Sequence, residues 1–90
     1  MRRKAPNMSA IAINYDERFD VLYLRLHKKD SVYGDENDTG VVTLRRVDDD
    51  TVAGMIVYDF RKQYMDGVLN LDGLPIPIDE NLPDIARILK

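Results

Sequence analysis

The chain has 90 residues, a formal net charge of -3, a pI near 5.0 and no cysteine. The absence of cysteine excludes disulfides, thiolate zinc sites and cysteine nucleophiles, and the acidic balance argues against a strongly basic nucleic-acid surface. No run approaches the ~18 apolar residues of a membrane span, and residues 1–4 lack the apolar segment of a secretion signal, so we expect one soluble, cytoplasmic domain.

The first predicted element is a hairpin. In residues 10–15 large apolar side chains alternate with small or polar ones, which is the two-residue period of a strand with one buried face. Residues 16–20 form a short polar connection, and residues 21–26 repeat the strand pattern. A connection of this length joins two strands directly, so these segments should pair with each other.

The middle of the chain predicts a polar connection followed by a second hairpin. Residues 27–40 are polar and rich in turn formers, and within them only residues 31–33 could add a short edge strand. Residues 41–47 and 52–59 resume the strand pattern on either side of an acidic turn at residues 48–51. These two segments are the third and fourth predicted strands.

The last third of the chain predicts less regular structure. Residues 61–67 favour one helical turn that ends at a glycine, and residues 68–71 favour a short strand. Residues 74–78 should be extended, because proline disfavours helix at itself and at the residue before it. Pro83 suits the first position of a helix over residues 83–90. A helix this short cannot stand alone, so it should pack on the sheet.

The predicted architecture is therefore an α+β domain over residues 10–90, an antiparallel β-meander of about four strands with a short C-terminal helix. A disordered basic arm at residues 1–9 precedes it. The strands at residues 21–26 and 52–59 carry apolar side chains on both faces, and one short helix covers only one face of a sheet. We therefore expect a homodimer, formed through the second face of the sheet or through an edge strand.

A spaced signature begins where the first strand ends. It reads Tyr-Asp-x-x-x-Asp-x-Leu-Tyr and, with a glycine in the last strand, comprises Tyr15, Asp16, Asp20, Leu22, Tyr23 and Gly54. A glycine inside a strand usually marks a bulge or the close approach of another backbone. The signature resembles an uncharacterised prokaryotic domain-of-unknown-function family, number twenty-two eighty-three, over residues 13–60; residues 61–90 form a C-terminal extension. The resemblance implies a small antiparallel sheet with a helix and, by association with toxin-like neighbours only, an antitoxin-like role.

The two aspartates of the signature bracket the first turn. Paired carboxylates can serve acid and base roles in hydrolysis, and a metal-dependent enzyme that uses Asp16 and Asp20 is one alternative. Their simpler role is structural, because aspartate side chains accept hydrogen bonds from turn amides. No nucleophile elbow, glycine-rich phosphate loop or second histidine accompanies them, so we predict neither enzymatic activity nor a cofactor.

Two acidic clusters are the candidate surfaces for a basic protein partner. They comprise Asp35, Glu36 and Asp38 in the central connection and Asp48, Asp49 and Asp50 in the second hairpin turn. In the same stretch, Asp35, Asn37, Thr39 and Gly40 match the first, third, fifth and sixth positions of a calcium-binding loop. The twelfth position of that loop is Arg46, however, where the site needs a glutamate, so we predict no calcium site.

These observations favour binding over catalysis. We expect a protein-binding module that self-associates and masks a basic partner, as antitoxins and nucleic-acid-mimicking inhibitors do. Weak nucleic-acid binding is a further alternative. It would use the basic residues Arg2, Arg3 and Lys4 together with Arg45 and Arg46.

Overall fold

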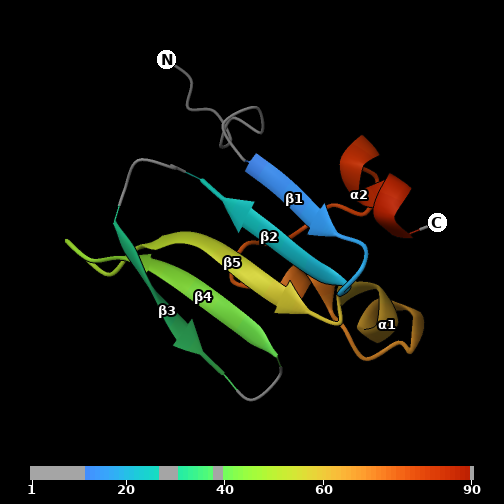
Figure 1. The fold of residues 1–90 in the computed structure, drawn as a ribbon, viewed down its shortest axis with the longest axis horizontal. Coiled ribbons are helices and arrows are strands. Elements are labelled where there is room, and N and C mark those ends of the chain that lie inside the picture. Colours follow the sequence, from blue (N-terminus) through green and yellow to red (C-terminus); the bar gives the residue numbers. More distant parts are fainter. Residues whose placement is uncertain (1–11, 27–30, 38–39, 90) are drawn as a thin grey trace.

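Five antiparallel strands form one sheet, and two short α-helices follow them (Figure 1). The structure, a computed structural model, describes residues 12–26, 31–37 and 40–89. The strands are β1 (Ala12–Asp16), β2 (Val21–Arg25), β3 (Val32–Glu36), β4 (Val41–Arg46) and β5 (Val52–Tyr58). After them come α1 (Phe60–Met65), a 3-10 turn η2 (Leu71–Gly73) and α2 (Pro83–Leu89). The predicted α+β class with a C-terminal helix is confirmed. The predicted N-terminal arm lies outside the described residues.

The order of the strands departs from that of a simple meander. It is β1-β2-β5-β4-β3, so the chain passes from β2 to β3 at the far edge and returns to β2 through β4 and β5. The sheet has five strands where about four were predicted. The additional strand is β3, which extends the short edge segment expected at residues 31–33 and pairs with β4 along its whole length. β1 and β3 are the two edges of the sheet.

One face of the sheet is covered by the chain that follows β5 (Figure 1). Alternate residues of β2 and β5 point to this face, as their two-residue period predicts. The buried core comprises Leu22, Leu24, Val41, Met55, Val57, Phe60, Leu74, Ile78 and Ile85. Ile85, in the first turn of α2, is fully buried and anchors the helix to the sheet. The segment after β5 therefore supplies the second layer of the core, with four of its nine residues.

No described element covers the opposite face of the sheet (Figure 1). Its central side chains are Val21, Tyr23, Val42, Ile56 and Tyr58, which the pairing of β2, β5 and β4 places next to one another. Tyr23 and Tyr58 are 38% and 43% exposed, respectively. We call this surface the open face.

The segment between α1 and α2 differs from the prediction in one place. Residues 68–71 do not form the expected strand. The Asn70 side chain accepts a hydrogen bond from the Asp72 amide at 3.1 Å, and the chain turns into η2. Pro83 is the first residue of α2, as predicted. Among the described residues, no helix has the length and apolar character needed to cross a membrane.

Candidate functional site

The Asp20 carboxylate joins the first turn to the start of α1. It accepts hydrogen bonds from the Tyr15 hydroxyl at 2.7 Å and from the backbone amides of Arg61 at 2.8 Å and Lys62 at 3.0 Å. The Asp20 carbonyl accepts a further bond from the Phe60 amide at 3.1 Å. The first amides of a helix have no partner inside the helix. Here three of them are satisfied by one residue of a distant turn.

Asp20 replaces the cap that α1 lacks locally. Asp59, which precedes the helix, has φ 54° and makes no side-chain capping bond. Asp20 itself has φ 57°, in the left-handed region that aspartate tolerates better than most residues. The first turn is therefore shaped to present both the carbonyl and the carboxylate of Asp20 to α1.

The hydrogen bond between Tyr15 and Asp20 fixes the protonation state of both groups. Burial, reinforced by the hydrogen bond to Asp20, raises the pKa of Tyr15 to about 12. Burial alone would raise the pKa of Asp20, but the bonds from the Tyr15 hydroxyl and the two helix amides outweigh it and lower that pKa. At neutral pH the tyrosine is protonated and the aspartate ionised, which suits a fixed hydrogen bond better than proton transfer.

Asp16 has a separate and more local role. Its carboxylate accepts hydrogen bonds from the amides of Arg18 at 3.0 Å and Phe19 at 3.2 Å, so it closes the turn that it begins. Asp16 and Asp20 therefore bond to different partners. Within the described ranges, no three acidic or histidine side chains are grouped as a metal site would require.

The remaining signature residues lie in the sheet. Leu22 is in the core and Tyr23 is on the open face. A Cβ at Gly54 would lie 2.3 Å from the Leu24 carbonyl oxygen and 2.9 Å from Cδ of Arg25, so β2 and β5 can approach only because Gly54 has no side chain. The register of β4 against β5 also shifts next to Gly54, which makes a bulge.

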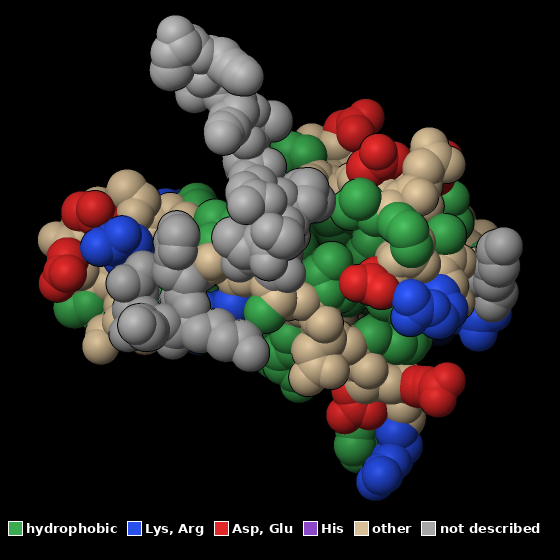
Figure 2. Space-filling model, turned by 90° about the horizontal axis from the view of Figure 1, so that it is seen from above, with side chains coloured by type: hydrophobic (Ala, Val, Ile, Leu, Met, Phe, Trp, Pro, Cys, Tyr) green, Lys and Arg blue, Asp and Glu red, His purple; other side chains and the backbone are tan. Residues whose placement is uncertain are grey.

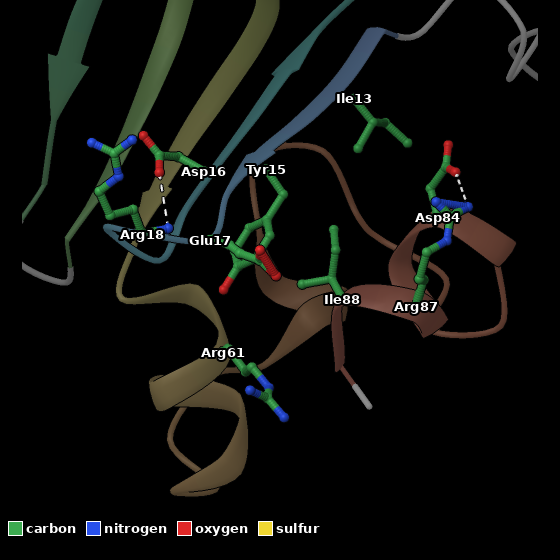
Figure 3. A pocket seen from close by; sticks show the side chains of 9 residues that line it. All are labelled: Ile13, Tyr15, Asp16, Glu17, Arg18, Arg61, Asp84, Arg87 and Ile88. Atoms are coloured by element: carbon green, nitrogen blue, oxygen red, sulfur yellow. Dashed lines mark hydrogen bonds and ion pairs between the residues drawn. The ribbon is translucent and has the colours of Figure 1, made fainter.

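An open groove of about 1030 Å³ lies between β1 and α2 (Figure 3). It is lined by Ile13, Tyr15, Asp16, Glu17, Arg18, Arg61, Asp84, Arg87 and Ile88. Figure 3 shows Ile13 and Tyr15 pointing from β1 towards Ile88 of α2, while Asp16 points to the other side of the strand. We call this surface the edge groove. The sequence did not predict it, because its two walls come from opposite ends of the chain.

A second hollow lies between the sheet and the proline-rich segment, with a volume of about 370 Å³. Its described lining is apolar throughout: Ile13, Leu24, Leu26, Val52, Pro75, Ile76, Pro77, Ile78, Leu82 and Ile85. Seen from the side where β1 and α2 lie, hydrophobic side chains gather around a hollow, with acidic and basic side chains beside it (Figure 2). Ile13 lines both this hollow and the edge groove.

The acidic residues proposed to meet a basic partner are largely engaged within the chain. Asp35 forms an ion pair with Arg45 at 3.0 Å, and Asp49 lies 3.7 Å from Nε of Arg46. Asp50 accepts a hydrogen bond from the Tyr33 hydroxyl at 2.6 Å. Glu36 and Asp48 are exposed, and Asp38 lies outside the described residues, as do Arg2, Arg3 and Lys4.

Comparisons with family models, with curated proteins and with solved structures found no match to this chain. The resemblance of residues 13–60 to the domain-of-unknown-function family stays a prediction.

Proposed function

We propose that the protein is a small protein-binding module that self-associates and has no catalytic activity of its own. The observation that carries the proposal is the open face of the sheet. Tyr23, Ile56 and Tyr58 lie there with exposed or half-buried side chains, although β2 and β5 are covered on the opposite face of the same sheet.

The composition of the open face supports binding to a protein. Tyr23 lies opposite Ile56 and Val21 lies opposite Tyr58 in the pairing of β2 with β5, so two aromatic rings flank an aliphatic centre. Tyrosine is enriched at the centres of protein interfaces, because its ring buries a large apolar area while its hydroxyl keeps a polar partner. A contiguous patch of this kind marks an interaction surface more often than scattered apolar residues do.

The acidic clusters add little to this proposal. Asp35 and Asp49 already have basic neighbours in Arg45 and Arg46. Carboxylates that are neutralised within the chain attract a basic partner weakly. We therefore assign partner binding to the open face and not to the masking of a basic protein by acidic turns.

Two measurements test the proposal. Sedimentation velocity of the full chain across the micromolar range should show association that increases with concentration. Binding to a partner is tested by affinity capture from a lysate of the source organism, with the wild type compared against Tyr23→Arg and Tyr58→Arg. These open-face variants should lose the proteins that the wild type retains, because a buried arginine charge without a partner opposes binding.

The matched control is Met65→Arg. Met65 is 55% exposed at the end of α1 and is not part of the open face, so the same substitution there should leave capture unchanged. A monomer at every concentration would remove self-association from the proposal. Equal capture by Tyr23→Arg, Tyr58→Arg and the wild type would remove the open face as the binding surface.

A further inference from the structure

We propose that two copies of the chain pair along β1, antiparallel and centred on Asn14, and so form one continuous sheet of twice five strands. The inference rests on the self-association proposed above and names the surface through which it occurs. That surface consists of the outer edge of β1 and the edge groove beside it.

The pairing pattern leaves the backbone groups of Ile13 and Tyr15 pointing away from the sheet. The Leu26 amide, just after β2, donates to the Ala53 carbonyl of β5 at 2.8 Å. The backbone amides and carbonyls of successive residues in a strand point alternately to its two neighbours. Even-numbered residues of β2 therefore bond to β5, and odd-numbered residues bond to β1. Odd-numbered residues of β2 lie opposite even-numbered residues of β1. The amides and carbonyls of Ile13 and Tyr15 therefore face outward.

In the described part of the chain, no backbone hydrogen bond reaches these four outer groups. β1 carries a single charge, Asp16 at its last position, and residues 12–15 are uncharged, so most of its length lacks the charges that usually protect an edge strand. The other edge of the sheet is different. β3 carries Asp35 and Glu36 and is exposed along most of its length, which discourages the addition of a strand.

The positions of the outer groups select one register. Ile13 and Tyr15 must lie opposite outward-facing residues of the second copy, because only these have free donors and acceptors. If Ile13 lies opposite Tyr15 of the second copy, the four outer groups of each copy all form hydrogen bonds. Every residue from 12 to 16 then has a partner in the second copy. Asn14 then faces Asn14 of the second copy across a two-fold axis. This is the self-complementary arrangement that a symmetric dimer requires.

The charges beside β1 are compatible with a second copy. The edge groove is lined by three acidic and three basic side chains, namely Asp16, Glu17 and Asp84 with Arg18, Arg61 and Arg87. A surface with equal numbers of both signs can face a copy of itself without net repulsion. Ile13 and Ile88, which line the same groove, would lose contact with water.

The geometry has a consequence for partner binding. The two-fold axis of an antiparallel edge pairing runs perpendicular to the sheet, so both open faces lie on the same side of the joined sheet. Two adjacent copies of the surface with Tyr23 and Tyr58 would then bind a partner that carries two matching segments with increased apparent affinity.

Disulfide trapping tests the register directly, because the chain contains no cysteine of its own. In Asn14→Cys two thiols would face each other in a pair that is not hydrogen-bonded, with Cα atoms about 4.5 Å apart, which is within the range of a disulfide. Mild oxidation should convert most of this variant to a covalent dimer. Glu36→Cys, at an exposed position on β3, should form no covalent dimer under the same oxidation.

Amide hydrogen exchange of the wild type gives a second readout that requires no substitution. The amides of Ile13 and Tyr15 should exchange more slowly as the protein associates, while the outward amides of β3 should not change. If the protein associates without slower exchange at these two amides and Asn14→Cys cross-links no faster than Glu36→Cys, the β1 interface is wrong and self-association stands. If the protein is monomeric at every concentration, self-association fails and the β1 interface fails with it.

Discussion

The Asp20 carboxylate stabilises contacts between segments that are far apart in the sequence. Replacing it with alanine removes the Tyr15 bond and leaves two helix amides without partners. We expect Asp20→Ala to lower the free energy of unfolding by about 2 kcal/mol, since hydrogen bonds to charged groups and helix caps are each worth about 1–3 kcal/mol. Urea denaturation measures the change.

Asp16→Ala is the control and should lower the free energy of unfolding by about 1 kcal/mol or less, because Asp16 closes only its own turn. A larger loss in Asp16→Ala than in Asp20→Ala would contradict this assignment.

The Tyr15 hydroxyl should make the stability of the fold decrease as the pH rises through the alkaline range. Its pKa is raised from 10.0 to about 12 in the folded state, so folding favours the protonated form. The stabilisation is complete below pH 10.0 and is lost as the pH rises towards about 12. Urea midpoints at about pH 9 and about pH 11 should therefore fall more steeply for the wild type than for Tyr15→Phe. Equal slopes in the two proteins would show that Tyr15 does not carry the effect.

The strands were predictable because their signal is local. Leu22 and Leu24 in β2, and Met55 and Val57 in β5, alternate with residues of the other face, and the structure buries all four. Residues 68–71 carry a similar apolar signal and form no strand. There the Asn70 side chain captures the amide two residues on, an interaction that competes with pairing to a distant strand.

The candidate site was predictable only in part. The spacing of Tyr15, Asp16 and Asp20 drew attention to the first turn, and hydrogen bonding within a turn can be anticipated from aspartate chemistry alone. The bonds from Asp20 to the amides of Arg61 and Lys62 could not be anticipated. They join residues more than 40 positions apart, and their partners are backbone groups that carry no residue-type signal. The edge groove was missed for the same reason.

Because β2 and β5 approach closely at Gly54, a single added methyl group there should strongly destabilise the fold. A Cβ at Gly54 would overlap the Leu24 carbonyl oxygen, a backbone atom that cannot move without breaking the strand pairing. We expect Gly54→Ala to destabilise the protein by about 3 kcal/mol, at the upper end of the cost of overpacking. The control is Gly73→Ala, whose Cβ would lie no closer than 3.4 Å to its neighbours. Thermal melting of the two variants should separate them clearly, and equal melting temperatures would contradict the close approach.

The sheet and the chain that follows it form one cooperative unit. Leu74, Ile78 and Ile85 come from the extension and are buried against side chains of the sheet. The Tyr64 hydroxyl also donates a hydrogen bond to Glu80 at 2.7 Å, which ties α1 to the segment before α2. The extension therefore supplies three of the nine buried residues of the hydrophobic core.

A chain that ends at residue 66 should consequently fail to fold. Burial of Leu74, Ile78 and Ile85 contributes about 1.5–3 kcal/mol for each side chain, and their sum is comparable to the whole stability of a small domain, about 5–15 kcal/mol. Truncation also leaves Leu22, Leu24 and Met55 facing water. Circular dichroism of the fragment should lack the strand signal and show no cooperative urea transition. The matched control is the chain from residue 10 to residue 90, which keeps every described residue and should unfold cooperatively. The prediction would be wrong if the 1–66 fragment unfolded cooperatively at the same urea midpoint as the full chain. The sheet would then need no cover from the chain after α1.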